Sequence, residues 1–242
     1  MKPWISGSKE LLTHAVEHMN NGSAFDNRIA FISIDNAIEL MIKTFLGLPK
    51  RIRKSNGPSR RKLDDASNSF PDLLDLLEEH FTELIEEINL EDIEWYHRLR
   101  NTLYHDGNGI TVDKEKVDSY LQISIILFNI LFTEEFNKDI EFEPQSILGE
   151  IVLRFSQLEE KIKQLYINHF PEKNMRTIQL SKAIQELYKK GVISKELLSQ
   201  FDDVFIIRNQ SVHNSGKFDK SAVIKATDSI LDISAKIQSL YN

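Results

Sequence analysis

The chain has 242 residues, of which 41% are hydrophobic, so it is long enough to form one large or two modest domains with apolar cores. It contains no cysteine, which excludes a disulfide framework and any thiolate metal site or nucleophile. The formal net charge of -7 argues against indiscriminate nucleic-acid binding, and the scarcity of glycine and proline favours long helices over a many-turned β fold.

Residues 1–25 predict one extra helix, from about Ser8 to Met19, with Ser8 as its N-cap. The N-terminal stretch lacks the long apolar core of a secretory signal. The most apolar window, Leu121 to Phe132, is too short to span a bilayer. We therefore expect a cytoplasmic protein without a membrane partner, which the absence of cysteine also favours.

Residues 26–137, called copy A, predict four helices near 26–47, 70–88, 91–105 and 112–137. In the first of them, apolar residues such as Phe31, Ile34 and Ile38 recur at three- and four-residue spacing. The segment 50–62 interrupts this pattern and is interpreted as a loop inserted in copy A.

The segment 50–62 reads KRIRKSNGPSRRK and contains seven basic residues and no acidic one, whereas the rest of the chain has 23 (30 less 7) basic and 37 acidic residues. Its cations either bind an RNA backbone or are simply solvated, and both interpretations stay open. The seven residues are Lys50, Arg51, Arg53, Lys54, Arg60, Arg61 and Lys62.

Residues 148–242, called copy B, follow a linker near 138–146 and predict helices near 147–169, 177–190, 194–213 and 219–241. Its first helix aligns with that of copy A at an offset of 121 residues, which pairs Ile34 with Phe155 and Glu39 with Glu160. We interpret the chain as all-α, with no strand: two tandem four-helix bundles arising from an internal duplication.

A short polar motif ends the third helix of each copy. Copy A has RNTLYH at 100–105 and copy B has RNQSVH at 208–213, so both read R-N-x-x-x-H before a glycine-containing turn. The middle residues differ, yet Arg100, Asn101 and His105 in copy A match Arg208, Asn209 and His213 in copy B. Asparagine and histidine four residues apart share a helix face, and a long arginine side chain can reach round to join them.

This motif, at the end of the third helix of a small helical bundle, resembles that of the HEPN superfamily, and the form with asparagine after the arginine resembles its ribonuclease members. The resemblance covers residues 26–137 and 148–242. It implies that the copies pack as an intramolecular pseudo-dimer, in which the two motifs form one composite site that cleaves RNA without a metal or cofactor. It also implies a role in phage defence or stress response, and a homodimer or a protein antitoxin or regulator as further partners.

By this resemblance, the 2′-hydroxyl of the RNA attacks the adjacent phosphate and leaves a 2′,3′-cyclic phosphate. One histidine, of His105 and His213, helps remove the 2′-OH proton, and the other assists the leaving 5′-oxygen. Arg100 and Arg208 stabilise the charge on the phosphorane. Asn101 and Asn209 orient the histidine or the phosphate. In a toxin branch of the family a tyrosine stands two residues after the histidine; here those positions are Gly107 and Ser215.

Several other polar or aromatic residues have two interpretations. Glu39 and Glu160 either orient the motif or form surface ion pairs, and Trp95 and Tyr96 either stack on a base or, as we favour, pack in the core. His14 and His18 have a metal-ligand spacing but no supporting cluster, so we interpret them as solvent-facing. His80, His97 and His169 have no evident partner. The alternative to a ribonuclease is a non-catalytic HEPN-like module that binds nucleic acid, a nucleotide or a protein.

Overall fold

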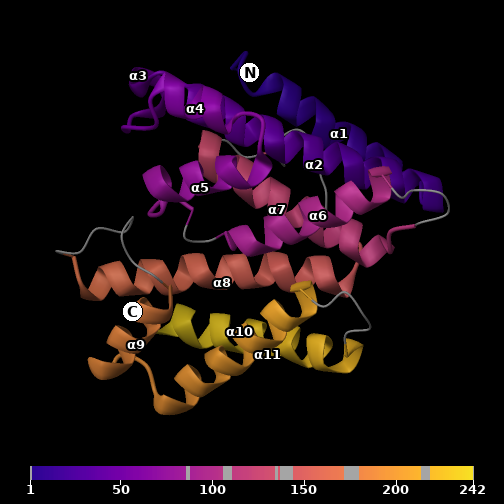
Figure 1. The fold of residues 1–242 in the computed structure, drawn as a ribbon. Coiled ribbons are helices and arrows are strands. Elements are labelled where there is room, and N and C mark those ends of the chain that lie inside the picture. Colours follow the sequence, from indigo (N-terminus) through magenta and orange to yellow (C-terminus); the bar gives the residue numbers. More distant parts are fainter. Residues whose placement is uncertain are drawn as a thin grey trace. The chain divides into compact units, whose positions relative to one another are not determined.

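The protein is described here from a computed structural model, which covers residues 2–85, 88–105, 111–133, 136, 144–171, 180–213 and 219–241. These residues form helices and connecting turns, and no strand occurs among them, as the sequence predicts (Figure 1). The chain divides into two compact units, Met1–Glu143 (unit 1) and Pro144–Asn242 (unit 2), which are considered one at a time.

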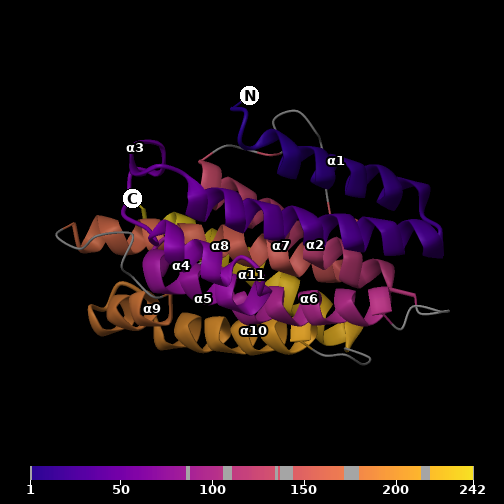
Figure 2. The same cartoon turned by 45° about the horizontal axis from the view of Figure 1, so that its top comes forward.

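Unit 1 is built around α2, which packs against α1, α4, α5, α6 and α7. Figures 1 and 2 show α1 lying along α2 over most of its length. The helices are α1 (Ser6–Asn21), α2 (Ala24–Gly47), α3 (Lys50–Arg53), α4 (Arg60–Ala66), α5 (Phe70–Phe81), α6 (Leu90–His105) and α7 (Lys114–Phe132). The segment 50–62 was predicted to be a loop, but the structure places α3 and the first turn of α4 in it.

The predicted N-cap at Ser8 is wrong. The helix begins two residues earlier, at Ser6, with Ile5 as its N-cap, and the Ser8 hydroxyl donates to the Ile5 carbonyl at 3.1 Å. The next helix does have the expected kind of cap, because the Ser23 hydroxyl accepts from the Asp26 amide at 3.1 Å. Gly22, with a φ of 76°, makes the left-handed turn between α1 and α2.

His18 links the C-terminal end of α1 to the start of α2, because its Nδ1 lies 2.7 Å from Asp26 Oδ1 and its side chain is 20% exposed. The solvent-facing interpretation of His18 is therefore wrong. His14 does face solvent, with 53% of its side chain exposed and Glu17 at 3.6 Å. The four-residue spacing of the two histidines is about one helical turn. His18 joins two helices, and His14 lies at the surface.

Unit 2 repeats the order of the four main helices of unit 1, without α1 and without the segment between α2 and α5. Its first helix, α8, packs against the other three. Its core includes Leu158, Ile162, Leu187 and Ile233, all fully buried. The helices are α8 (Ile147–His169), α9 (Leu180–Lys189), α10 (Lys195–His213) and α11 (Lys220–Ser239).

None of the helices in the described part of the chain is both long and apolar enough to cross a membrane. Several sequence predictions fall outside the described residues: the linker at 138–143, the turn at 106–110, and the positions Gly107 and Ser215.

Candidate functional site

The first motif lies at the C-terminal end of α6, and its arginine occupies a core-facing position. Ile93, Tyr96 and Leu103 are fully buried at spacings of three and seven residues, and Arg100 falls in the same register, four residues after Tyr96. Only 19% of the Arg100 side chain is exposed. The guanidinium is therefore directed toward α2 instead of extending into solvent.

Arg100 meets a buried carboxylate there. Asp35, on α2, is fully buried, and its Oδ2 lies 2.9 Å from Arg100 Nε. Arg100 also donates from Nη1 to Asn101 Oδ1 at 3.0 Å and from Nη2 to Asn36 Oδ1 at 2.9 Å. The plane of the guanidinium is thus fixed by groups on two helices. A single ammonium could not make this set of contacts.

Two further side chains hold Asp35. His97 Nδ1 lies 3.1 Å from both carboxylate oxygens, and its ring stacks on Phe70 with a centroid distance of 4.0 Å. The Tyr120 hydroxyl, from α7, donates to Asp35 Oδ1 at 2.8 Å. Burial, together with the adjacent Asp35 charge, raises the pKa of Tyr120 well above its usual value, so the phenol stays protonated and donates.

The remaining motif residues of copy A lie closer to solvent. Asn101 is half-buried and accepts the bond from Arg100, whereas His105, at the last position of α6, is exposed. Tyr104 is 65% exposed, and its ring lies 5.9 Å from the Arg100 guanidinium carbon. The copy A motif therefore combines a fixed, mostly buried arginine with a histidine that solvent can reach.

The second motif has the same local geometry at the end of α10. Arg208 is 8% exposed and follows Phe201 and Val204 in the buried register of its helix. Its Nη1 donates to Asn209 Oδ1 at 3.1 Å, as Arg100 does to Asn101. His213 is the last residue of α10, and its side chain lies outside the described residues.

Glu39 and Glu160 do not contact the arginines. Glu39 pairs with Lys43 one turn later on α2, at 2.6 Å, and Glu160 is exposed on α8. The ion pair of Glu39 fits the surface interpretation. The acid that contacts the motif is Asp35, which sequence reasoning missed together with Asn36, His97 and Tyr120. Two signals were present in the sequence: an acid beside the apolar positions of α2, and a histidine one turn before Arg100.

Tyr96 packs in the core, as favoured, since it is fully buried and stacks on Tyr120 with a centroid distance of 4.4 Å. Trp95 is half-buried, with the Lys116 ammonium 5.6 Å from its ring centroid. The other two histidines lie away from the motifs: His80 is 3.7 Å from Glu79, and the His169 carbonyl accepts a hydrogen bond from Lys190.

The seven basic residues of segment 50–62 fall into two groups. Arg53 is half-buried and bonded to backbone carbonyls, and Lys62 pairs with Glu79 at 2.7 Å. Lys50, Arg51, Lys54 and Arg60 are exposed, as is Arg61, whose Nε lies 3.9 Å from Asp65.

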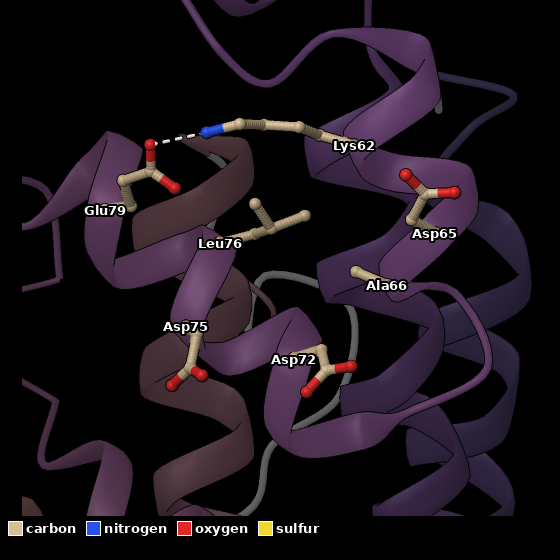
Figure 3. A pocket seen from close by; sticks show the side chains of 7 residues that line it. All are labelled: Lys62, Asp65, Ala66, Asp72, Asp75, Leu76 and Glu79. Carbon is tan, nitrogen blue, oxygen red and sulfur yellow. Dashed lines mark hydrogen bonds and ion pairs between the residues drawn. The ribbon is translucent and has the colours of Figure 1, made fainter.

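A shallow pocket of about 270 Å³ lies between α4 and α5, and Figure 3 shows its lining. Four of its side chains are acidic, and the Lys62 ion pair with Glu79 closes one side, where the hydrogen bond from Lys62 lowers the pKa of Glu79. Among the described residues, no three histidine or acidic side chains come close enough together to hold a metal ion. The acidic lining residues are Asp65, Asp72, Asp75 and Glu79.

Comparison of the chain with protein-family models, with curated proteins and with solved structures finds no match.

Proposed function

We propose that the protein is an endoribonuclease that cleaves RNA by attack of the 2′-hydroxyl, at a composite site to which both R-N-x-x-x-H motifs contribute. The observation that carries the proposal is the arginine–asparagine hydrogen bond, which has the same form in both motifs, at 3.0 Å in copy A and 3.1 Å in copy B. Duplication alone does not explain why this side-chain geometry is the same in both motifs while the neighbouring residues differ. A shared chemical role at the two helix ends would explain it.

A fixed guanidinium suits the transition state of this reaction. Arg100 uses one N–H of each terminal nitrogen for Asn36 and Asn101, which leaves two N–H groups without an acceptor among the described residues. An N–H group on each terminal nitrogen thus remains available to donate to phosphate oxygens. Because Asp35, Asn36 and Asn101 already hold the group in place, little reorganisation is needed as charge develops on the phosphorane.

The proton transfers fall to the two histidines in this proposal. One imidazole accepts the proton of the 2′-hydroxyl while its oxygen bonds to phosphorus, and the other gives a proton to the departing 5′-oxygen. The products are a 2′,3′-cyclic phosphate and a 5′-hydroxyl, with atoms and charge balanced and no metal required. The exposure of His105 supports this role, because a general acid or base must reach its substrate.

The test is RNA cleavage in EDTA, with mapping of the product ends, by the wild type, by His105→Ala and His213→Ala, and by the double variant. Each single change should reduce cleavage by about 10²- to 10⁴-fold, and the double change should cost little more, because both imidazoles act on one transition state. His14→Ala is the matched control, since this exposed histidine lies on α1.

Two independent sites would leave about half of the activity in each single variant. If folded His105 and His213 variants cut RNA at the wild-type rate, or the wild type cuts none, a non-catalytic binding module becomes the better description. Activity that EDTA abolishes and a divalent ion restores would mean that the chemistry lies elsewhere.

A further inference from the structure

We propose that part of segment 50–62 forms a preorganised surface that binds the phosphate backbone of single-stranded RNA, separately from the motifs. The basic ridge, as we call it, consists of Lys50, Arg51, Lys54 and Arg60. The inference rests on the proposed function for the identity of the polyanion and adds a second contact for the same substrate.

Arg53 anchors the segment to unit 1. Its Nη1 donates to the carbonyls of Phe45 at 3.1 Å and Leu46 at 2.6 Å, the last turn of α2. Its guanidinium carbon also lies 5.1 Å from the ring centroid of Phe81 and 5.9 Å from that of Phe45. Burial lowers the pKa of Arg53, because the packed guanidinium is less well solvated than a free one.

Gly57 completes this anchor. A Cβ added at Gly57 would lie only 2.1 Å from Arg53 Nη2, so the chain passes directly over the guanidinium and any side chain there would displace it. The turn that carries Gly57 therefore packs on Arg53, which is hydrogen-bonded to α2. These contacts tie segment 50–62 to α2, although its composition is that of a solvated loop.

The four ridge cations differ from the other basic residues of the segment. All four are exposed, and none forms an ion pair with a described acidic residue, whereas Lys62 is tied to Glu79. They lie on α3, directly after it and at the first position of α4. Such cations can replace the counterions of a phosphate backbone, which is favourable because the counterions are released.

An RNA strand fits this surface better than a membrane does. No large hydrophobic side chain of residues 48–69 is exposed, so the ridge lacks the apolar face that interfacial helices use. The second half of α4 and the start of α5 carry acids, including Asp64, Asp65 and Asp72, which an anionic membrane plane would also meet.

The ridge and the copy A motif lie at different positions along α2. Figures 1 and 2 show α3 at the C-terminal end of α2, whereas Arg28, near the other end, donates to the Leu103 carbonyl of α6 at 3.0 Å. Asp35 and Gly47 are separated by about 18 Å along the helix axis at 1.5 Å per residue. At about 3.4 Å per nucleotide, the rise of stacked bases in a helix, a strand needs roughly five intervals to bridge that distance, and an extended strand needs fewer.

The binding test uses a dT20 oligonucleotide, which carries the same phosphodiester charge but lacks the 2′-hydroxyl that the proposed cleavage requires. Replacing all four ridge cations with glutamine should reduce the slope of log affinity against log salt by about 2.8, at roughly 0.7 for each phosphate contact. The control variant replaces Lys182, Lys189, Lys195 and Lys225, exposed in unit 2, and changes net charge equally. Equal slopes of log affinity against log salt in the two variants, or no binding of dT20 by the wild type, would contradict the proposal that the basic ridge binds a phosphate backbone.

Gly57→Ala tests the preorganisation, because it displaces Arg53 while every cation stays. We expect the affinity for dT20 to fall about threefold to tenfold, as ridge side chains lose their order, with the salt slope kept. Unchanged affinity in a folded variant would contradict the preorganisation.

Cleavage separates this inference from the proposed function. In the quadruple variant, U20 should be cut more slowly than by the wild type at low substrate concentration, whereas the dinucleotide UpU, which has a single nucleotide interval and cannot bridge the two positions, should be cut at the wild-type rate. If the wild type leaves U20 intact but the dT20 slopes differ as stated, the ridge stands and the ribonuclease proposal fails. If the wild type cuts U20 but the two variants have equal dT20 slopes, the ribonuclease proposal stands and the ridge proposal fails.

Discussion

The two motif helices, α6 and α10, share a buried register, but the residues around the copy A arginine are not repeated at the matched positions of copy B. At an offset of 108 residues, Ile93 matches Phe201, Tyr96 matches Val204 and Arg100 matches Arg208, and Arg208 and its two matched neighbours on α10 are all buried. Both arginines donate to the asparagine that follows. This part of the site depends only on neighbours within one helix, and it is the same in both motifs although the surrounding residues differ.

The network around Asp35 has no counterpart at the matched positions of copy B. Asp35 aligns with Ser156, and His97 with Phe205, which packs near Phe155 with a ring-centroid distance of 5.9 Å. The buried registers of α7 and α11 match at an offset of 106, which pairs Tyr120 with Ala226. An acid, a histidine and a tyrosine in one copy thus correspond to a serine, a phenylalanine and an alanine in the other.

This difference teaches that the copies are not interchangeable halves. The arginine–asparagine pair is a local feature of a helix end, whereas the Asp35 network joins α2, α6 and α7, and its acid, histidine and tyrosine are not repeated at the matched positions of copy B. Breaking the network should therefore affect unit 1 strongly, and the same change in unit 2 should matter little.

The largest expected effect is that of Asp35→Asn compared with Ser156→Ala. Asparagine keeps the shape of Asp35 but removes a fully buried charge that faces Arg100, His97 and Tyr120. Breaking a buried pair typically costs about 3–5 kcal/mol, whereas a substitution away from such features stays within about 0.5 kcal/mol. Urea unfolding of both variants measures the difference. Equal losses would show that Asp35 has no special role.

A double-mutant cycle sharpens this result by isolating the pair. Asp35→Asn with Arg100→Gln should be less destabilised than the sum of the single changes, with a coupling of about 1.5–3 kcal/mol, because both singles remove the same interaction. Cleavage by the single variants should fall together if Asp35 holds Arg100 in position. A coupling near zero would mean that the 2.9 Å contact contributes no stability.

Tyr120→Phe should have a smaller effect, of about 1.5–2 kcal/mol, because it removes one hydrogen bond to a charged acceptor and leaves the ring stacked on Tyr96. Tyr188→Phe is the control, since Tyr188 is 38% exposed on α9 and its change should be nearly neutral. The urea concentrations at the unfolding midpoints of the two variants are compared. The comparison requires that the unfolding free energy depends equally steeply on urea concentration in both. A loss no larger than the control's would mean that the hydroxyl does not stabilise Asp35.

The helices could be predicted from the sequence because apolar residues repeat at helical spacing over ten or more positions in each main helix. The helical structure of segment 50–62 could not be predicted in this way, since α3 has only four residues and no periodic apolar face. Its structure comes from a tertiary anchor, Arg53 on the carbonyls of α2, which composition does not reveal. The sequence singles out all seven basic residues alike, and only the structure separates Arg53 and Lys62, which have protein partners, from the four cations of the ridge.

The motif residues were singled out from the sequence because their pattern occurs twice. Asp35 was not singled out, since it lies 65 positions before Arg100 and the matched position of copy B is Ser156. A search for repeated features favours Glu39 and Glu160, which recur but contact neither arginine. Function assigned from repetition therefore identifies what the copies share and misses what makes them differ.

The smallest expected effect concerns the start of the first helix in each copy. Ser23 and Ser146 both cap their helices, but the residue three positions later is Asp26 in copy A and Gly149 in copy B. The hydrogen bond from the Ser23 hydroxyl, with a further one from His18, lowers the pKa of Asp26 to about 2 from an ordinary value of 3.8. A carboxylate with a lowered pKa stabilises the fold above its unfolded pKa, and this stabilisation is lost as the pH falls toward 2.

Asp26→Asn should therefore flatten the pH dependence of stability between about pH 4 and 2, which hydrogen exchange of the α1 amides can follow. Glu10→Gln is the control, because Glu10 is exposed on α1, and the α8 amides should not respond to either change. If the α1 amides of the Asp26→Asn variant keep the wild-type pH dependence, the link through His18 does not hold α1 against α2.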